Sequence, residues 1–161
     1  MMKPVYAALL LAGTGLTLAA CSDGAGTPVE DAAPDGIAGL EITNARMMLP
    51  PVEGNPAALY FDIAYDGERN LAIRNADVAG ADRAELHDMM EYDFEMTMGE
   101  MPPLMMQPGD RVSFEPGGKH VMAFDLSPEL AAGGTTEVTL IAAGGDKHSF
   151  EVPIQAAGDE R

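Results

Sequence analysis

From about residue 37 to residue 155, the sequence is a succession of short segments in which apolar and polar residues alternate. The clearest alternation places four apolar side chains on one face of a candidate strand: Leu59, Phe61, Ile63 and Tyr65. Successive side chains of a strand point to opposite faces, so a period of two predicts half-buried strands. Turn-forming residues such as Asp66-Gly67 separate the segments, and no window of a dozen residues carries a helical stripe. The pattern predicts eight or nine strands and an all-β fold, an antiparallel β-sandwich or barrel.

Two of these segments carry sulfur and imidazole side chains. One predicted strand has a single face made of Tyr92, Phe94, Met96 and Met98, and another has a face made of His120, Met122, Phe124 and Leu126. Ser127–Leu130 is predicted to form one helical turn, because Pro128 suits the first position of a helix.

The residues before this domain differ in composition. Met1–Ala20 combines a positive charge at Lys3 with an apolar stretch that ends in small residues, which is typical of a secretory signal peptide and too short for a stable membrane span. Residues 22–36 are mostly Gly, Pro, Ala and acidic residues, which favour disorder. We expect a signal peptide (1–20), a disordered acidic tether (21–36), a folded domain (37–155) and a frayed tail (156–161).

The sequence Leu18-Ala19-Ala20-Cys21 resembles the lipobox of bacterial lipoproteins. The resemblance implies that Cys21 is lipidated and anchors the mature protein to a membrane, facing the periplasm. Ser22 is not the aspartate that often signals retention in the inner membrane, so the outer membrane is mildly favoured. Because Cys21 is the only cysteine, the chain can form no internal disulfide, and lipidation would leave no thiolate for catalysis or metal binding.

The chain is strongly acidic. Its formal charge is −17, and removal of Lys3 with the signal peptide leaves 8 basic against 26 acidic side chains, a charge of −18. Such a protein does not bind nucleic acid through its phosphates. We find no nucleophile and base in a recognisable local motif, no glycine-rich phosphate loop and no convincing carboxylate pair, so an enzyme is not expected.

Seven of the twelve methionines lie between Leu86 and Met106. Methionine commonly fills gaps in cores, and clusters of it form adaptable contact surfaces. We expect the core role for Met47, Met48, Met105 and Met106. Beyond this, the roles of Met89, Met90, Met96, Met101, Met105 and Met106 are left open, although Met89 or Met90 could line a site beside His87. Met101 is expected to contribute, with Pro102-Pro103, to an apolar collar or docking surface.

Two histidines and two methionines form a possible metal site. His120 and Met122 are two residues apart on a predicted strand, so their side chains project to the same side, and Met98 can approach from a neighbouring strand. Thioether sulfur is soft and selects Cu(I), whereas zinc sites use thiolate, imidazole and carboxylate. A blue-copper site needs a cysteine thiolate, which Cys21 does not provide once lipidated. The residue types therefore favour a site that holds and releases Cu(I).

The spacing His-x10-Met-x21-His-x-Met resembles the signature of the periplasmic copper chaperone family PCuAC. Three segments also resemble those of the family: Asn55–Gly67 (NPAALYFDIAYDG), Ala84–Met89 (AELHDM) and Pro116–Met122 (PGGKHVM). The likeness extends from about Gly39 to Ile154.

This resemblance implies a cupredoxin-like Greek-key β-sandwich and four Cu(I) ligands: His87, Met98, His120 and Met122. It also implies delivery of copper to the copper centres of respiratory cytochrome c oxidase. The chain departs from the family at Lys119, where an aromatic residue is usual; the lysine would either weaken copper binding or point outward. There is no Met/His-rich tail after Ile154, and His148 is expected to be a surface residue.

Two alternatives stay open. The protein could sequester copper instead of delivering it, or it could be a metal-free interaction lipoprotein with a methionine-rich contact surface. A monomer is expected in each case.

Overall fold

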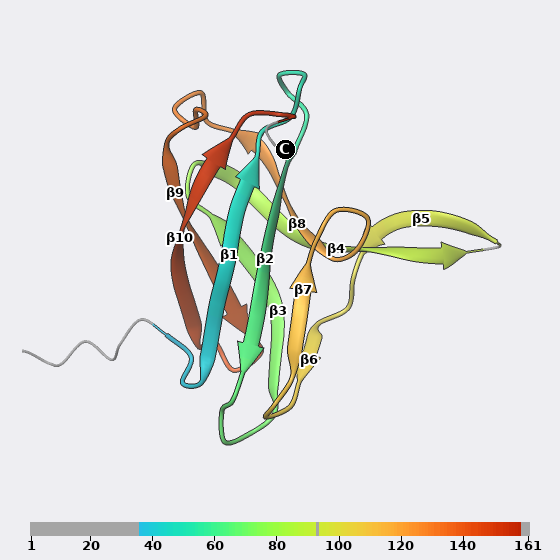
Figure 1. Cartoon of the computed structure of the whole chain (residues 1–161), viewed down its shortest axis with the longest axis vertical. Helices are drawn as coiled ribbons and strands as arrows, with labels where there is room; N and C mark the ends of the chain where they lie inside the picture. Colours follow the sequence, from blue (N-terminus) through green and yellow to red (C-terminus); the bar gives the residue numbers. More distant parts are fainter. Residues whose placement is uncertain (1–35, 93, 159–161) are drawn as a thin grey trace, which may run out of the picture. The chain divides into compact units, whose positions relative to one another are not determined.

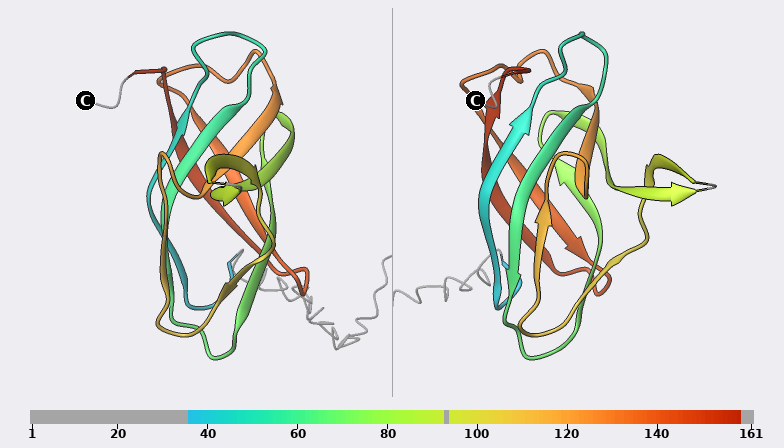
Figure 2. Two further views of the ribbon diagram at one scale, coloured as in Figure 1. Left: turned by 90° about the vertical axis from the view of Figure 1, so that its right-hand side faces the viewer. Right: turned by 45° about the vertical axis from the view of Figure 1, so that its right-hand side comes forward.

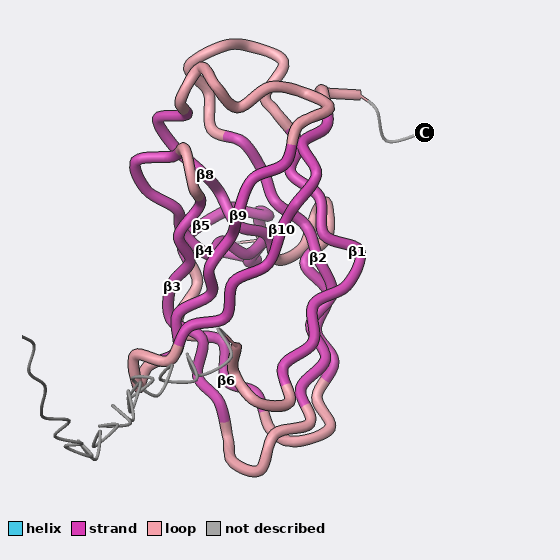
Figure 3. Tube along the Cα trace, turned by 90° about the vertical axis from the view of Figure 1, so that its left-hand side faces the viewer, coloured by secondary structure: helices cyan, strands magenta, loops and turns pink. Residues whose placement is uncertain are grey.

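The computed structural model describes residues 36–92 and 94–158, all of which fall within the unit Ala32–Arg161. The expected signal peptide, Cys21, nearly all of the tether and residues 159–161 lie outside the described residues. The described part of the chain contains ten strands and no helix (Figure 3). It therefore has no helix of the length and hydrophobicity that crossing a membrane requires. The predicted all-β class is confirmed.

The ten strands follow one another through short connections. In chain order they are β1 (Leu40–Met48), β2 (Ala57–Tyr65), β3 (Leu71–Val78), β4 (Ala81–Tyr92), β5 (Glu95–Glu100), β6 (Leu104–Met106), β7 (Arg111–Phe114), β8 (His120–Leu126), β9 (Thr135–Ala142) and β10 (Lys147–Gln155).

The strands form one continuous sheet that folds over into two facing layers (Figure 1). The strand order is β5-β4-β8-β2-β1-β10-β9-β3-β6, with β7 also paired to β2. All strand pairs are antiparallel except β1 with β10, which run parallel where Met47 lies beside Ile154. This parallel pair connects the two layers and makes the sheet mixed, a detail that the predicted antiparallel sandwich did not include.

The core lies between the layers and follows the predicted alternation. Every second residue of β2 is buried, from Ala57 to Tyr65. The Phe61 ring stacks on Phe114 of β7 with 4.6 Å between ring centroids. Burial of such side chains contributes about 1.5–3 kcal/mol each. The opposite face of the layer that contains β4, β8 and β2 is directed away from this core, and it carries the candidate site.

A projecting hairpin is the most distinctive feature of the molecule. The twelve-residue strand β4 pairs with β8 as far as His87 and with β5 from His87 to Tyr92. The distal part of β4 and all of β5 extend away from the sandwich (Figures 1 and 2). We call residues 87–92 and 94–100 the hairpin. Within its described residues, Met90, Phe94, Met96 and Met98 are exposed.

Several local predictions were wrong. Tyr92 and Phe94 do not share a strand with Met98, because the chain reverses direction between Tyr92 and Glu95. Ser127–Leu130 forms a turn closed by Leu130 N donating to Ser127 O, and not a helical turn. The three-residue strand β6 was not predicted.

The predicted core role is confirmed for three methionines and wrong for one. Met47, Met48 and Met106 are buried. Met105 is 65% exposed, because it alternates with Met106 on β6 and therefore points away from the core.

Candidate metal centre

Strand pairing brings the four predicted ligands to one face of the sheet. His87 of β4 lies directly opposite His120 of β8, and their ring centroids are 5.9 Å apart. Met122 follows His120 by two residues on the same strand. Met98 lies opposite Met89 on the β4–β5 ladder, and Met89 follows His87 by two residues. Because side chains two residues apart share a face, His87, Met98, His120 and Met122 project to the same side.

His120 lies at the centre of this group and is buried. Its Nδ1 lies 2.8 Å from the backbone carbonyl oxygen of Gly118, and its Nε2 lies 3.2 Å from the Met98 sulfur. Both partners only accept hydrogen bonds, and the carbonyl oxygen is the stronger acceptor, so in the neutral ring Nδ1 carries the proton and Nε2 presents a lone pair. A nitrogen lone pair and a thioether sulfur therefore converge on the same point.

His87 has a similar arrangement. Its Nε2 lies 3.0 Å from the Glu85 carboxylate, whereas its Nδ1 is buried and has no hydrogen-bond partner among the described residues. Hydrogen bonds from His87 and then from Arg83 hold the pKa of Glu85 below its usual range, so Glu85 is a carboxylate acceptor at neutral pH. With the proton on Nε2, Nδ1 is left with a lone pair, and a buried polar atom without a partner is uncommon in a folded protein.

Each histidine thus has one nitrogen held by an oxygen acceptor and the other without a proton. Histidine ligands of metal ions commonly have this arrangement, in which the acceptor fixes the tautomer and the ring orientation. Among residues 36–92 and 94–158, no three His, Cys, Asp or Glu side chains form a cluster suited to a metal ion. The chemical character of the site comes instead from imidazole nitrogen beside thioether sulfur, which suits a soft ion.

The predicted departure at Lys119 has a structural explanation. The Lys119 ammonium forms an ion pair with Asp88, with 2.7 Å between Nζ and the carboxylate oxygen. Lys119 and Asp88 each precede or follow a site histidine by one residue, so they alternate to the other face of the sheet. The Lys119 side chain therefore points away from the site, which is the second of the two alternatives expected from the sequence.

Aromatic and cationic side chains border the histidines. The Tyr60 ring of β2 lies 6.4 Å from the His120 ring, and the Phe124 ring lies 6.4 Å from the His87 ring. The Arg83 guanidinium stacks over Phe124 at 4.0 Å while also bonding Glu85. Arg83 therefore supports both the carboxylate that holds His87 and one wall beside it.

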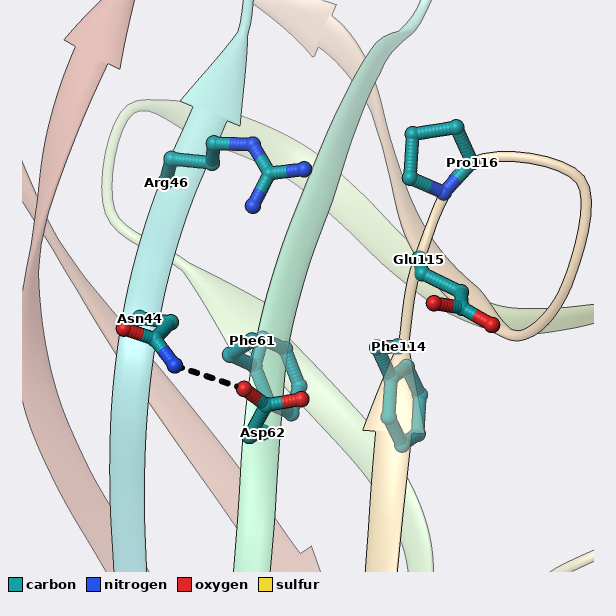
Figure 4. A pocket seen from close by; sticks show the side chains of 7 residues that line it. All are labelled: Asn44, Arg46, Phe61, Asp62, Phe114, Glu115 and Pro116. Carbon is teal, nitrogen blue, oxygen red and sulfur yellow. Dashed lines mark hydrogen bonds between the residues drawn. The ribbon is translucent and has the colours of Figure 1, made fainter.

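A surface pocket lies elsewhere on the same layer. Its volume is about 400 Å³, and its lining residues come from β1, β2 and β7 and the residues after β7 (Figure 4). A hydrogen bond from Asn44 is the main cause that lowers the pKa of Asp62 in this pocket. None of the four predicted ligands lines it.

The prediction for His148 was wrong. His148 is half-buried on β10, and its Nδ1 accepts a hydrogen bond from the Ile37 backbone N–H at 3.2 Å. Burial lowers the pKa of His148. It is therefore partly buried and hydrogen-bonded within the sandwich.

The sequence interpretation missed two groups of the site, the Glu85 carboxylate and the Gly118 carbonyl. The same two-residue rule that paired His120 with Met122 would have placed Glu85 beside His87. The Gly118 carbonyl had no signal of its own, because every residue has one.

Comparison with solved structures identifies the class of fold. The chain is similar to the copper-bound PCuAC domain from PmoF2, with a TM-score of 0.61 and 19% identity over 75% of this chain and 96% of that chain. It is also similar to the solution structure of CuI-DR1885 from Deinococcus radiodurans, with a TM-score of 0.57 and 19% identity over 81% of this chain and 87% of that chain. The molecule has the cupredoxin-like β fold of PCuAC domains, as predicted.

A match of the sequence to a family model assigns the chain to a family. A family model described as lipoprotein LpqE-like matches residues 40–154, which include every strand except the final residue of β10. The chain belongs to the LpqE-like family. A search of curated proteins finds no match.

Proposed function

We propose that this protein is an extracytoplasmic metallochaperone that binds Cu(I) through His87, Met98, His120 and Met122 and passes it to another protein. The observation that carries the proposal is the pair of oriented histidines. His120 Nε2 faces the Met98 sulfur at 3.2 Å, and His87 Nδ1 is buried without a partner. Copper would be the electron-pair acceptor for these donors. The proposed role involves no catalysis.

Neutral nitrogen and sulfur donors fit this cargo. Four uncharged ligands leave the single charge of Cu(I) uncompensated, whereas hard divalent ions prefer oxygen ligands. The Glu85 carboxylate supplies a negative charge near the site through its hydrogen bond to His87. Binding requires no thiol deprotonation, only neutral histidines.

The exposure of one proposed ligand, Met98, supports delivery of copper over its storage. His120 is buried at 7% exposure, whereas Met98 is 47% exposed. A partner can therefore reach one ligand of the site without unfolding the domain, and a thioether is a weak ligand that exchanges readily. We infer that the recipient is a copper centre of a respiratory oxidase or another chaperone, in accordance with the resemblance to PCuAC proteins.

The proposal includes a lipid anchor at Cys21, followed by the tether and the domain of residues 37–155, which would hold the site near a membrane. The family description as LpqE-like lipoprotein supports the anchor. Labelling with a palmitate analogue in cells tests it, since Cys21→Ala should abolish the label and alter the distribution of the protein between membrane and soluble fractions.

Copper binding is tested by anaerobic Cu(I) competition titration of residues 22–161, which keep all ten strands and omit the Cys21 thiol. We expect one tightly bound copper, weakened by His120→Ala and by Met122→Ala. Met105→Leu is a matched control, because Met105 is an exposed methionine on β6, in the other layer. Absence of tight binding would refute the proposal and favour a metal-free contact surface.

Delivery and sequestration are separated in cells. A deletion strain that loses oxidase activity under copper limitation supports delivery. A strain that becomes sensitive to excess copper and keeps its oxidase activity would contradict delivery and support sequestration.

A further inference from the structure

The hairpin carries a row of thioethers that is longer than the predicted site needs. Met89 of β4 lies directly opposite Met98 of β5, and Met96 precedes Met98 by two residues. Directly opposite residues have Cβ atoms about 4.5–5.5 Å apart and diagonal neighbours about 7–8 Å, within reach of long side chains. Met89, Met96 and Met98 therefore share one face of the hairpin, the face that also carries His87.

Met90 lies on the other face of the same hairpin. It pairs with Thr97, and its terminal methyl is the nearest atom to the position that a Cβ on Gly99 would occupy, at 3.4 Å. The three-methionine row is thus a property of one face and not of the hairpin as a whole.

Exposure falls along this row toward the histidines. Met96 near the hairpin end is 62% exposed, Met98 is 47% exposed, and His120 is 7% exposed. Met89 is half-buried. A large apolar side chain gains little stability at an exposed position of a projecting hairpin, so packing does not account for Met96.

We propose that Met89, Met96 and Met98 form a second, outer Cu(I)-binding position, through which copper enters and leaves the histidine site. This inference rests on the proposed function. Met98 belongs to both positions. Its sulfur lies 3.2 Å from His120 Nε2, and on the β4–β5 ladder Met98 lies directly opposite Met89. The outer position takes Cu(I) in particular, because three thioethers are soft and uncharged.

The transfer between positions is a ligand exchange. Copper keeps its bond to the Met98 sulfur while its bonds to the Met89 and Met96 sulfurs break and bonds to imidazole nitrogen form. Copper stays Cu(I) throughout, so no electron is exchanged. No proton has to leave His120, because its Nδ1–H points to the Gly118 carbonyl and its Nε2 presents the lone pair.

The experiment combines stoichiometry and loading rate on residues 22–161. Cu(I) is supplied anaerobically as its bicinchoninate complex, first to one equivalent and then in excess. The variants are Met89→Leu and Met96→Leu, which preserve size and apolar character. The matched controls are Met90→Leu on the opposite face of the hairpin and Met105→Leu on β6.

When Met98 is held in the tight site, the outer position keeps the Met89 and Met96 sulfurs. We therefore expect a second, weaker copper equivalent in the unmodified chain and in both controls. Met89→Leu and Met96→Leu should lose that equivalent and load the tight site more slowly than the controls, while the affinity of the tight site stays unchanged. Equal effects of Met90→Leu and Met96→Leu, or no second equivalent in the unmodified chain, would overturn the outer position. Absence of the tight equivalent would instead refute the proposed function itself.

Discussion

Met106 and Met96 are ten residues apart in the chain, but their surroundings are opposite. Met106 is fully buried in the sandwich core, where β6 pairs with β3, and Met96 is 62% exposed on the projecting hairpin. The same side chain therefore serves as packing in one region and as an accessible sulfur in the other. What decides between these roles is the alternation of each strand and whether a second layer covers it.

The histidines show the same contrast between the sandwich and its outer face. The sandwich uses His148 as a half-buried hydrogen-bond acceptor, whereas the outer face holds His87 and His120 with one nitrogen of each free of a proton. We propose that interior groups stabilise the fold and that groups on the outer face near the hairpin bind the ligand. The following predictions test that division.

The largest effect is expected for a methionine in the core. Met106→Ala should lower the free energy of unfolding by about 2–5 kcal/mol, because it leaves a cavity. Met96→Ala should change it by less than about 0.5 kcal/mol, as usual for surface substitutions. Urea denaturation of the copper-free chain measures both, and comparable losses for the two variants would contradict the division.

Copper affinity should depend on pH through the site histidines. Protons compete with copper for the imidazole lone pairs. The affinity should therefore fall as the pH is lowered, by at most about tenfold per pH unit for each histidine ligand. Competition titrations at pH 7.5 and 5.5 check this, and unchanged affinity would mean that the histidines are not ligands.

A smaller effect is expected when the acceptor of His87 is altered. Glu85→Gln keeps the size of the side chain but removes its charge, and it should weaken Cu(I) binding by about tenfold, the scale of losing an orienting partner. Glu100→Gln is the control, since Glu100 lies opposite His87 on β5 and is exposed. Nitrogen-15 NMR of the imidazoles should show a changed tautomer of His87 only in Glu85→Gln. An identical tautomer and affinity in both variants would remove Glu85 from the site.

The smallest effect belongs to His148. Burial lowers its pKa in the folded state, so the unfolded chain binds the proton first as the pH falls. The stability contribution of His148 is fully present above about pH 6.5 and is lost as the pH falls below that value toward the lowered folded pKa. Denaturation midpoints of the unmodified chain and His148→Gln should therefore converge on acidification. A gap that widens at low pH would contradict this sign.

Part of this structure could be predicted from sequence because its cause is local. The alternation from Leu59 to Tyr65 predicted β2 and its buried face. The two-residue spacing of His120 and Met122 predicted that they share a face, and both lie on β8. The grouping of four ligands came from resemblance to a family.

Other features could not be predicted because tertiary contacts decide them. Alternation continues through Phe94, which is not a typical turn residue, yet its backbone has a positive φ of 65° and the chain reverses there. The parallel pairing of β1 with β10 joins segments about a hundred residues apart and leaves no local signal. The strand β6 has only three residues, too few to show a period.

The most direct test of the proposed copper site is carbon-13 NMR of the methionine methyl groups in residues 22–161, before and after one equivalent of Cu(I). We predict that the methyl signals of Met98 and Met122 shift, while those of Met47 and Met106 in the core stay in place. If Met98 and Met122 do not respond to a copper that is tightly bound, the proposed ligand set is wrong.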